Sequence, residues 1–327
     1  MSKSLWKKVY RKYGIKIMKS TVIKDDRKRS YVAKLHGDDG NLYILKSLYL
    51  SQQRQQFIAM SEVLLRKKGI QLAEPIPTKN EELYFQYKGY PYVLYPWIEG
   101  DRHPLNTRSD LRSIIEVLAN MHRASYGLHF PSRVKIYRNV DWKKEYRMKR
   151  KQMKTFFQQN KNAKDPKKRE FAKYVPFFLK LSKKSLRYLK KSSYTDLASR
   201  SYKKRSLIHG DAHQGNILSD NRRINIIDFE DVRFDFPSRD INRLFAKYTR
   251  RHDFTREIFD NMMQTYLETN PLSADERKVV MIDLLFPHVF TRLLKLKKYK
   301  LITLKEIKHV IKQEKKKGKY ILKRLNR

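Results

Sequence analysis

The stretch Ser206–Asp231, SLIHGDAHQGNILSDNRRINIIDFED, guides the interpretation of the whole chain. Apolar residues at its start and in a second run near its end predict two short buried strands around a polar loop. The loop presents Asp211, His213, Asn216 and Asp228, side chains that suit a phosphate and its metal ion. Mg²⁺ prefers oxygen ligands. An Asp, an Asn five residues later and a second Asp after the next strand therefore match the pattern of phosphoryl-transfer sites.

The same letters carry a family resemblance. HGDAHQGN (residues 209–216) followed by IIDFED (residues 226–231) resembles the aminoglycoside phosphotransferase and choline kinase branch of the protein-kinase-like fold. Eukaryotic protein kinases have Arg where this chain has Gly210. The alternative is a polar hairpin turn with unrelated acidic residues. The resemblance implies an α+β, bilobal protein-kinase-like fold, with a small β-rich N-lobe at residues 1–97 and a large helical C-lobe at 98–327.

Composition narrows the class of protein. A chain of 327 residues can form two lobes with real cores. It contains no cysteine, which excludes disulfides and Cys-ligated zinc. No apolar run approaches the roughly 18 residues of a membrane-spanning helix. The start, MSKSLWKKVYRKYG, lacks the apolar core of a signal peptide, so we expect neither a membrane span nor a secretory leader.

The charge is strongly basic and uneven. Lys and Arg number 75 against 33 Asp and Glu, a net charge of +42. Residues 133–206 hold 26 Lys and Arg against 5 Asp and Glu, and residues 291–327 hold 15 against 2. Such charge predicts an anionic partner, either an acidic protein or an anionic substrate. Nucleic acid is a weaker hypothesis, because no known binding module is present and the aromatic residues recur at helical spacing.

Apolar spacing predicts a short helix and an entry strand within residues 2–19, followed by strands at 21–23, 31–35 and 42–46. The resemblance makes Lys46 the phosphate-binding lysine; the alternative is a surface lysine on an edge strand. The turn at residues 24–30, which would cover the phosphates, contains no glycine. We therefore expect its backbone N–H groups not to approach phosphates closely.

Residues 52–68 predict a helix in which Glu62 is the only acidic residue. Its position suits the glutamate that pairs with the strand lysine in kinases, and an exposed helix glutamate is the alternative. The segment YVLYPWIEG (residues 92–100) resembles the strand-to-hinge segment of these kinases. Backbone groups around Tyr95 and Trp97 would then hold the edge of an adenine, although a purely structural crossing fits the same letters.

Further amphipathic helices are predicted at 107–123, through the basic insertion (residues 133–205, with a break at Asp165-Pro166), and at 239–248, 254–267, 274–290 and 304–325. Pro287 is expected to kink or end the third of the last four. His122 is predicted to be a hydrogen-bonded core histidine. Asp240 resembles the family Asp that opens a helix and braces the catalytic loop, and an ordinary helix cap is the alternative.

The layout outside the loop narrows the resemblance. DWKKEYRMKRKQMK (residues 141–154), the segment 189–197, the two loop motifs and RDINRL (residues 239–244) together resemble the CotS/CotI-type spore coat proteins of endospore-forming bacteria. The similarity extends from about Lys46 to Tyr299. It implies synthesis in the mother-cell cytoplasm, a place in the spore coat, and other spore coat proteins as partners.

The resemblance also implies an activity: ATP-dependent transfer of phosphate to a hydroxyl of a small molecule or a coat protein. The implied roles are Asp211 to accept or orient the hydroxyl, Asn216 and Asp228 to hold Mg²⁺, Lys46 to neutralise phosphate charge, Glu62 to position Lys46, His209 to lock the loop, and Asp240 to brace it. The alternative is a structural coat component that keeps a kinase-like body without chemistry. A basic nucleic-acid binder is the third hypothesis.

Overall fold

The computed structural model describes residues 3–26, 30–139, 141–220, 223–295 and 298–326. Within them the chain forms two compact units. The first unit consists of Met1–His103, Ala124–Tyr137 and His209–Arg233. The second unit consists of Pro104–Arg123, Arg138–Ile208 and Phe234–Arg327. A β-rich N-terminal part and a larger helical part confirm the predicted α+β fold class.

The first unit is organised around a five-stranded antiparallel sheet with the order β1-β2-β3-β5-β4. The strands and the two helices of this part are β1 (Ile17–Asp26), β2 (Ser30–Gly37), β3 (Leu42–Ser47), β4 (Phe85–Tyr87), β5 (Tyr90–Pro96), α1 (Lys3–Tyr13) and α2 (Gln52–Lys67). Ser51 caps α2 by accepting a hydrogen bond from the Arg54 N–H. The predicted helices within residues 2–19 and at 52–68 and the predicted strands at 31–35 and 42–46 are confirmed, with small shifts at their ends. The predicted entry strand and the strand at 21–23 form one strand, β1.

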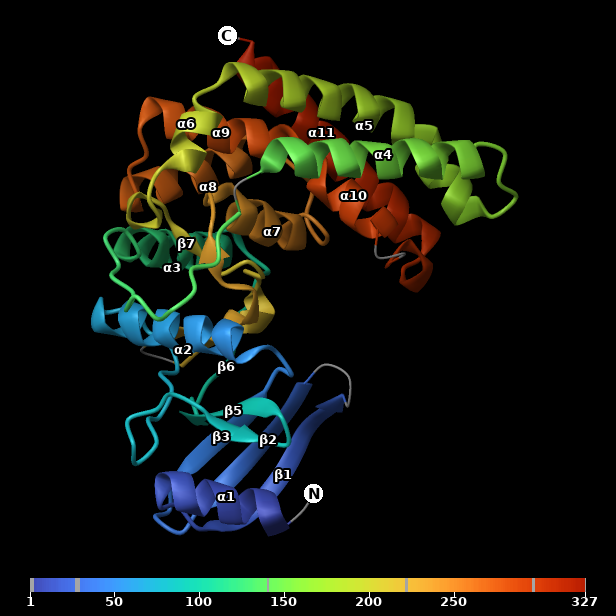
Figure 1. Ribbon diagram of the computed structural model, residues 1–327. Helices are drawn as coiled ribbons and strands as arrows, with labels where there is room; N and C mark the ends of the chain where they lie inside the picture. Colours follow the sequence, from blue (N-terminus) through green and yellow to red (C-terminus); the bar gives the residue numbers. More distant parts are fainter. Residues whose placement is uncertain (1–2, 27–29, 140, 221–222, 296–297, 327) are drawn as a thin grey trace. The chain divides into compact units, whose positions relative to one another are not determined.

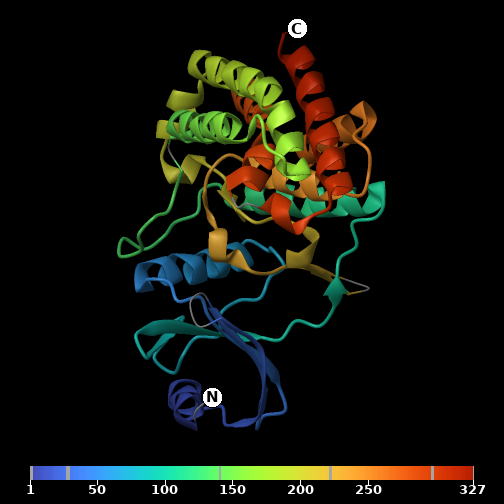
Figure 2. The ribbon, with the colours of Figure 1, turned by 90° about the vertical axis from the view of Figure 1, so that its right-hand side faces the viewer.

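The two helices cover opposite faces of this sheet (Figures 1 and 2). Side chains alternate across a strand, so Leu45 and Lys46 point to different faces. Leu45 packs in a buried cluster with Leu5 and Val9 of α1. Tyr95, on the face of Lys46, contacts Glu62 of α2. The sheet thus places Lys46 on the side of the unit that α2 covers.

The polar loop is also part of the first unit. β8 (Ile217–Ser219) pairs with β9 (Ile224–Ile226) and with β6 (Asp101–Arg102). Ile217 and Ile226 face each other and are buried. One-turn 3-10 helices lie before β8 at Gln214–Asn216 and after β9 at Phe229–Asp231. The two predicted buried strands are confirmed as β7 (Leu207–Ile208) and β9. Residues 209–216 follow β7 and precede β8, and residues 228–231 follow β9.

The second unit is helical. Its helices are α3 (Arg108–Ala124), α4 (Trp142–Asn160), α5 (Pro166–Lys191), α6 (Tyr194–Ser199), α7 (Ser238–Tyr248), α8 (Arg256–Thr269), α9 (Ala274–Leu285), α10 (His288–Lys295) and α11 (Leu304–Leu325). Further short elements are β7 (Leu207–Ile208), β10 (Arg233–Phe234), and 3-10 turns at Tyr202–Lys204 and Lys298–Leu301. The predicted break at Asp165-Pro166 is confirmed, because Asp165 caps α5. Pro287 separates α9 from α10, as a missing N–H requires.

A buried ionic cluster joins the helices of this unit. Both terminal nitrogens of Arg239 (α7) donate to Glu145 (α4), each at 2.9 Å. Asp283 (α9) accepts from Ser238 at 2.6 Å and from the His288 imidazole at 2.7 Å. The charges of its partners hold the pKa of Asp283 far below its usual value despite burial. The basic insertion is therefore tied into the core of its own unit.

Two predictions stay untested by the fold. One of them is the boundary between lobes at residue 97. The first compact unit extends to His103 and also includes residues 124–137 and 209–233. The other concerns the glycine-free turn at residues 24–30, because residues 27–29 lie outside the described part of the chain.

Candidate active site

Lys46 and Asp228 meet although 182 positions separate them in the sequence. β3 is an inner strand, and Lys46 lies opposite Val32 of β2 and Val93 of β5. The alternative of an edge-strand surface lysine is therefore excluded. The Lys46 ammonium forms an ion pair with the Asp228 carboxylate. Asp228 itself has a left-handed backbone, φ +69°, which is uncommon for a residue other than glycine.

Glu62 is buried beside this pair, with 4 % of its surface exposed, so it is not an exposed helix glutamate. The Tyr95 hydroxyl donates to it at 2.9 Å. Desolvation raises the pKa of Glu62 to about 8, although the Tyr95 hydrogen bond and the Lys46 charge both favour the ionised form. A carboxyl group that is mostly protonated at neutral pH attracts an ammonium group weakly. Among the described contacts Lys46 pairs with Asp228, and the predicted ion pair with Glu62 is not formed.

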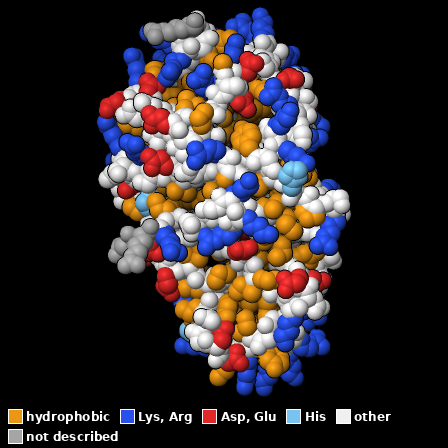
Figure 3. Space-filling view, turned by 90° about the vertical axis from the view of Figure 1, so that its left-hand side faces the viewer, with side chains coloured by type: hydrophobic (Ala, Val, Ile, Leu, Met, Phe, Trp, Pro, Cys, Tyr) orange, Lys and Arg blue, Asp and Glu red, His pale blue; other side chains and the backbone are white. Residues whose placement is uncertain are grey.

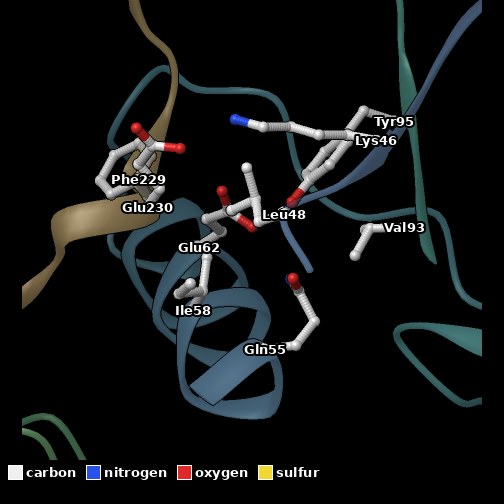
Figure 4. A pocket seen from close by; sticks show the side chains of 9 residues that line it. All are labelled: Lys46, Leu48, Gln55, Ile58, Glu62, Val93, Tyr95, Phe229 and Glu230. Carbon is white, nitrogen blue, oxygen red and sulfur yellow. Dashed lines mark hydrogen bonds between the residues drawn. The ribbon is translucent and has the colours of Figure 1, made fainter. Parts of the chain in front are cut away.

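A cavity of about 10 Å³ lies at this point, room for about one water molecule. Figure 4 shows the Lys46 side chain extending past Glu62 toward the segment of Phe229 and Glu230. The lining of the cavity also includes Leu48, Gln55, Ile58, Val93 and Tyr95. Burial, and then the Asp228 charge, raise the pKa of Glu230. The walls of the cavity thus combine apolar side chains with the Lys46 ammonium and with two carboxyl groups, Glu62 and Glu230, whose pKa values are raised.

Hydrogen bonds fix the orientation of His209. Its Nδ1 accepts from the Asp211 backbone N–H at 3.2 Å, so its Nε2 carries the proton and donates to the Ile227 carbonyl at 2.9 Å. These bonds tie the loop to the residue that precedes Asp228. Gly210 lies between them with φ +84°, and a Cβ there would lie 2.4 Å from the Asp231 carbonyl oxygen. Only glycine fits this position without a shift of the backbone.

The loop brings Asp211, His213 and Asn216 together. The Asn216 side-chain amide donates to the Asp211 carbonyl at 3.1 Å, which leaves the side-chain oxygen as the group that can bind a cation. His213 Nδ1 accepts from the Gly215 N–H at 3.0 Å, so His213 Nε2 carries the proton. That nitrogen lies 3.3 Å from Asp211 Oδ2. The sequence indicated His213 as one of the side chains that suit a phosphate and its metal ion. Its contact with Asp211 depends on the turn geometry and could not be predicted from the sequence.

The hinge segment differs in detail from the expectation. The Trp97 N–H donates to the Leu42 carbonyl at 2.9 Å and is thus used within the sheet. Successive backbone groups of a strand point in opposite directions. The carbonyl of Pro96, the last residue of β5, therefore points away from β3 and is a group that could hold an adenine edge. The sequence indicated the segment but not the direction of each group.

Asp240 and His122 belong to the second unit. Asp240 is fully buried in the first turn of α7 and contacts His122 Nε2 at 3.0 Å. The other ring nitrogen of His122 lies 3.0 Å from the Tyr266 hydroxyl. This confirms His122 as a hydrogen-bonded core histidine. Pro237 occupies the cap position of α7 without a side-chain cap bond, and Asp240 lies in the first turn of the helix. The bracing role of Asp240 stays a prediction.

A metal site is not preformed by clustered acids and histidines. Within the described ranges, no group of three or more His, Asp or Glu side chains is arranged to hold a metal ion. The side-chain oxygens of Asn216 and Asp228 are nevertheless the type of donor that Mg²⁺ prefers, and phosphate oxygens and water usually complete its shell. The donor chemistry therefore fits Mg²⁺ that arrives with a nucleotide.

Comparison with solved structures defines the class of fold. The chain is similar to an aminoglycoside phosphotransferase from Alicyclobacillus acidocaldarius, with a TM-score of 0.77 and 14 % identity over 100 % of this chain and 96 % of that one. It is also similar to spectinomycin phosphotransferase APH(9)-Ia in complex with ADP and spectinomycin, with a TM-score of 0.69 and 17 % identity over 98 % of each chain. The fold is therefore that of the kinase-like phosphotransferases.

Comparison with protein families goes one step further. The family model described as "Spore coat putative kinase YutH" matches residues 6–321, and the chain belongs to this family. A relative, spore coat protein S of Bacillus subtilis (strain 168), is 25 % identical over 259 residues, which are 76 % of this chain and 71 % of that protein. The resemblance to spore coat proteins is thus confirmed, and the family places the chain in the context of the coat. No helix in the described residues is long and apolar enough to cross a membrane.

Proposed function

We propose that this protein is an ATP-dependent phosphotransferase of the spore coat that phosphorylates a hydroxyl of a small molecule or of a coat protein. One observation carries the proposal: the loop positions Asp211, His213 and Asn216 together, while Asp228 meets Lys46 from the distant strand β3. In a site that had lost its function, these polar side chains would not be expected to stay together in this arrangement.

In this proposal the Asp211 carboxylate accepts the proton of the acceptor hydroxyl, while the hydroxyl oxygen forms a bond to the γ-phosphorus of ATP. The bond from that phosphorus to the β,γ-bridging oxygen breaks, and ADP leaves. Lys46 neutralises charge on the phosphates. Asn216 and Asp228 would hold Mg²⁺, which supplies charge neutralisation when bound. Catalysis here depends on position and electrostatics.

A second candidate is a structural coat component without catalytic activity. The observation that favours it is the Lys46–Asp228 ion pair, which engages both the phosphate-binding lysine and a metal ligand. Binding of a nucleotide with Mg²⁺ must first separate this pair. A protein in which the pair is too stable to separate would keep the fold and lose the chemistry.

A thermal-melt titration with Mg²⁺-ATP separates the two candidates. Binding to the native state raises the melting temperature, and a nucleotide at 100 times its Kd adds about 2.7 kcal/mol of stability. We expect a shift that requires magnesium and that disappears in both Lys46→Ala and Asp228→Ala. No shift at millimolar nucleotide would favour the structural candidate.

Asp211→Asn then tests the chemistry separately from binding. This variant should keep the Mg²⁺-ATP shift and lose phosphate transfer, measured with labelled ATP on a coat-protein extract. Turnover at the wild-type rate in Asp211→Asn would show that Asp211 does not have the assigned role.

A further inference from the structure

The longest described helix of the second unit, α5, carries cations along one face, with a gap between Lys173 and Lys180 where Pro176 lies inside the helix. These residues, which we name the α5 row, are Arg169, Lys173, Lys180, Lys183, Arg187 and Lys190. Their spacing of three, four or seven residues places them on one side of the helix. All six are exposed, and none forms an ion pair within the described part of the chain. Over 21 residues at a rise of about 1.5 Å, the row is about 32 Å long.

The α5 row lies opposite the buried face of the same helix, where Phe171, Val175 and Phe178 are fully buried. The only acidic residue of α5 is Glu170, which is not on the row. Like charges three or four residues apart destabilise a helix. On the face that Figure 3 shows, Asp and Glu side chains lie among the Lys and Arg side chains. The positive charge along the α5 row is thus denser than the average over the chain.

A second row lies on the neighbouring helix α11. Its exposed members, the α11 row, are Lys305, Lys308, Lys312, Lys319 and Lys323. The two helices pack side by side, because Gly318 of α11 lies against Leu181 of α5 and the Lys315 ammonium lies 5.4 Å from the Tyr174 ring (Figure 1). Two neighbouring helices therefore repeat positive charge with the period of an α-helix.

We propose that the α5 and α11 rows form a docking surface for an acidic helix of a partner protein. An acidic helix with Asp or Glu at positions i, i+3 or i+4, and i+7 repeats its carboxylates every 5.4 Å or so along its axis, as the rows do. An extended acidic chain repeats side chains of one face about every 6.8 Å and loses register within a few turns. Matching repeats let carboxylates face cations on both sides of the gap between Lys173 and Lys180.

The aromatic side chains of this surface argue against single-stranded nucleic acid as the partner. Binding of single strands uses exposed rings on which bases stack. Here Tyr174 and Tyr188 are only partly exposed, and the cations Lys173, Lys315 and Arg187 lie over them. The surface offers charge in register and no open stacking platform, which suits a polypeptide partner.

The test compares two variants with the same change in net charge. The row variant replaces Lys173, Lys180, Lys183 and Lys190 with Gln. The control variant replaces four exposed cations of the first unit, Lys3, Lys7, Arg11 and Lys67, with Gln. The probes are a synthetic Ala-rich peptide with Glu at the helical spacing, a peptide of the same composition in scrambled order, and a 20-base-pair DNA duplex. Fluorescence anisotropy at low and physiological salt gives each Kd.

We expect the helical peptide to bind the wild-type protein more tightly than the scrambled peptide does. The row variant should bind it at least tenfold more weakly, while the control variant changes less than twofold. Equal losses of affinity in both variants would show that the peptide recognises net charge alone, and would overturn the proposal. Equal affinity for the two peptides, or a duplex that binds more tightly than the helical peptide and loses affinity in the row variant, would also overturn it. Circular dichroism confirms that both variants remain folded.

Discussion

Glu62→Gln tests the electrostatics of the proposed nucleotide site without requiring a known substrate. In the unfolded chain the Glu62 carboxyl has an ordinary pKa near 4.5, and in the folded protein burial raises that pKa to about 8. The folded state therefore binds a proton that the unfolded state releases. The stabilisation from this proton is complete below pH 4.5 and is lost as pH rises toward 8.

The size of the effect follows from the pKa difference. Between pH 4.5 and 7 the unfolded group ionises over about 2.5 pH units while the folded group stays mostly protonated, which lowers the stability of the wild type by about 3 kcal/mol at 1.36 kcal/mol per unit. Gln is isosteric with a protonated Glu and can still accept the Tyr95 hydrogen bond. Glu62→Gln should therefore be about 3 kcal/mol more stable relative to wild type at pH 7 than at pH 4.

Urea denaturation at pH 4, 5.5, 7 and 8, followed by circular dichroism, measures this difference. Because all other groups titrate alike in both proteins, the difference between variant and wild type isolates Glu62. Glu99→Gln, an exposed residue near the hinge, is the matched control and should give no such trend. A pH-independent difference for Glu62→Gln would refute the inference that Glu62 is protonated at neutral pH.

Three further outcomes are expected. Gly210→Ala should lower the free energy of unfolding by at least about 2 kcal/mol in urea denaturation, because Gly210 has a positive φ and an added Cβ would collide with the Asp231 carbonyl. An unchanged denaturation midpoint would show that the loop adjusts freely. Asp283→Asn should cost about 3 kcal/mol by the same measurement, since it leaves the buried Arg239 with less compensation; a neutral change would mean that water reaches the cluster. His213→Ala should lower phosphate transfer roughly 10- to 100-fold in a labelled-ATP assay, because it releases the Asp211 carboxylate that His213 orients. A preserved Mg²⁺-ATP melting shift serves as the control. Full activity would count against a positioning role for His213.

Much of the fold follows from local rules that the sequence displays. Alternating apolar residues predict β3 as a strand, and Asp165-Pro166 predicts the start of α5, because periodicity and caps act within a few residues. The convergence of Lys46 with Asp228 was predictable only through the family resemblance. No local rule connects residues 182 positions apart.

Other features of the site could not be predicted, because they depend on tertiary burial. The raised pKa of Glu62 is a consequence of desolvation by burial, and the pairing of Lys46 with Asp228 is a tertiary contact. The direction of the Trp97 N–H depends on the pairing of β5 with β3. In both cases the residue was found in the sequence, but its partner was decided by packing.

The basic insertion shows how a charged segment can be both surface and core. Glu145 of α4 is one of its few acidic residues, and it accepts both terminal nitrogens of Arg239, the first residue of the RDINRL motif. Arg239 directly precedes Asp240, so α4 is linked to the turn that holds Asp240 against His122. Deletion of the insertion would remove Glu145, the carboxylate that accepts both terminal nitrogens of the buried Arg239, and would disturb α7. Its exposed cations therefore have to be tested by point substitution, since only those changes leave the buried cluster intact.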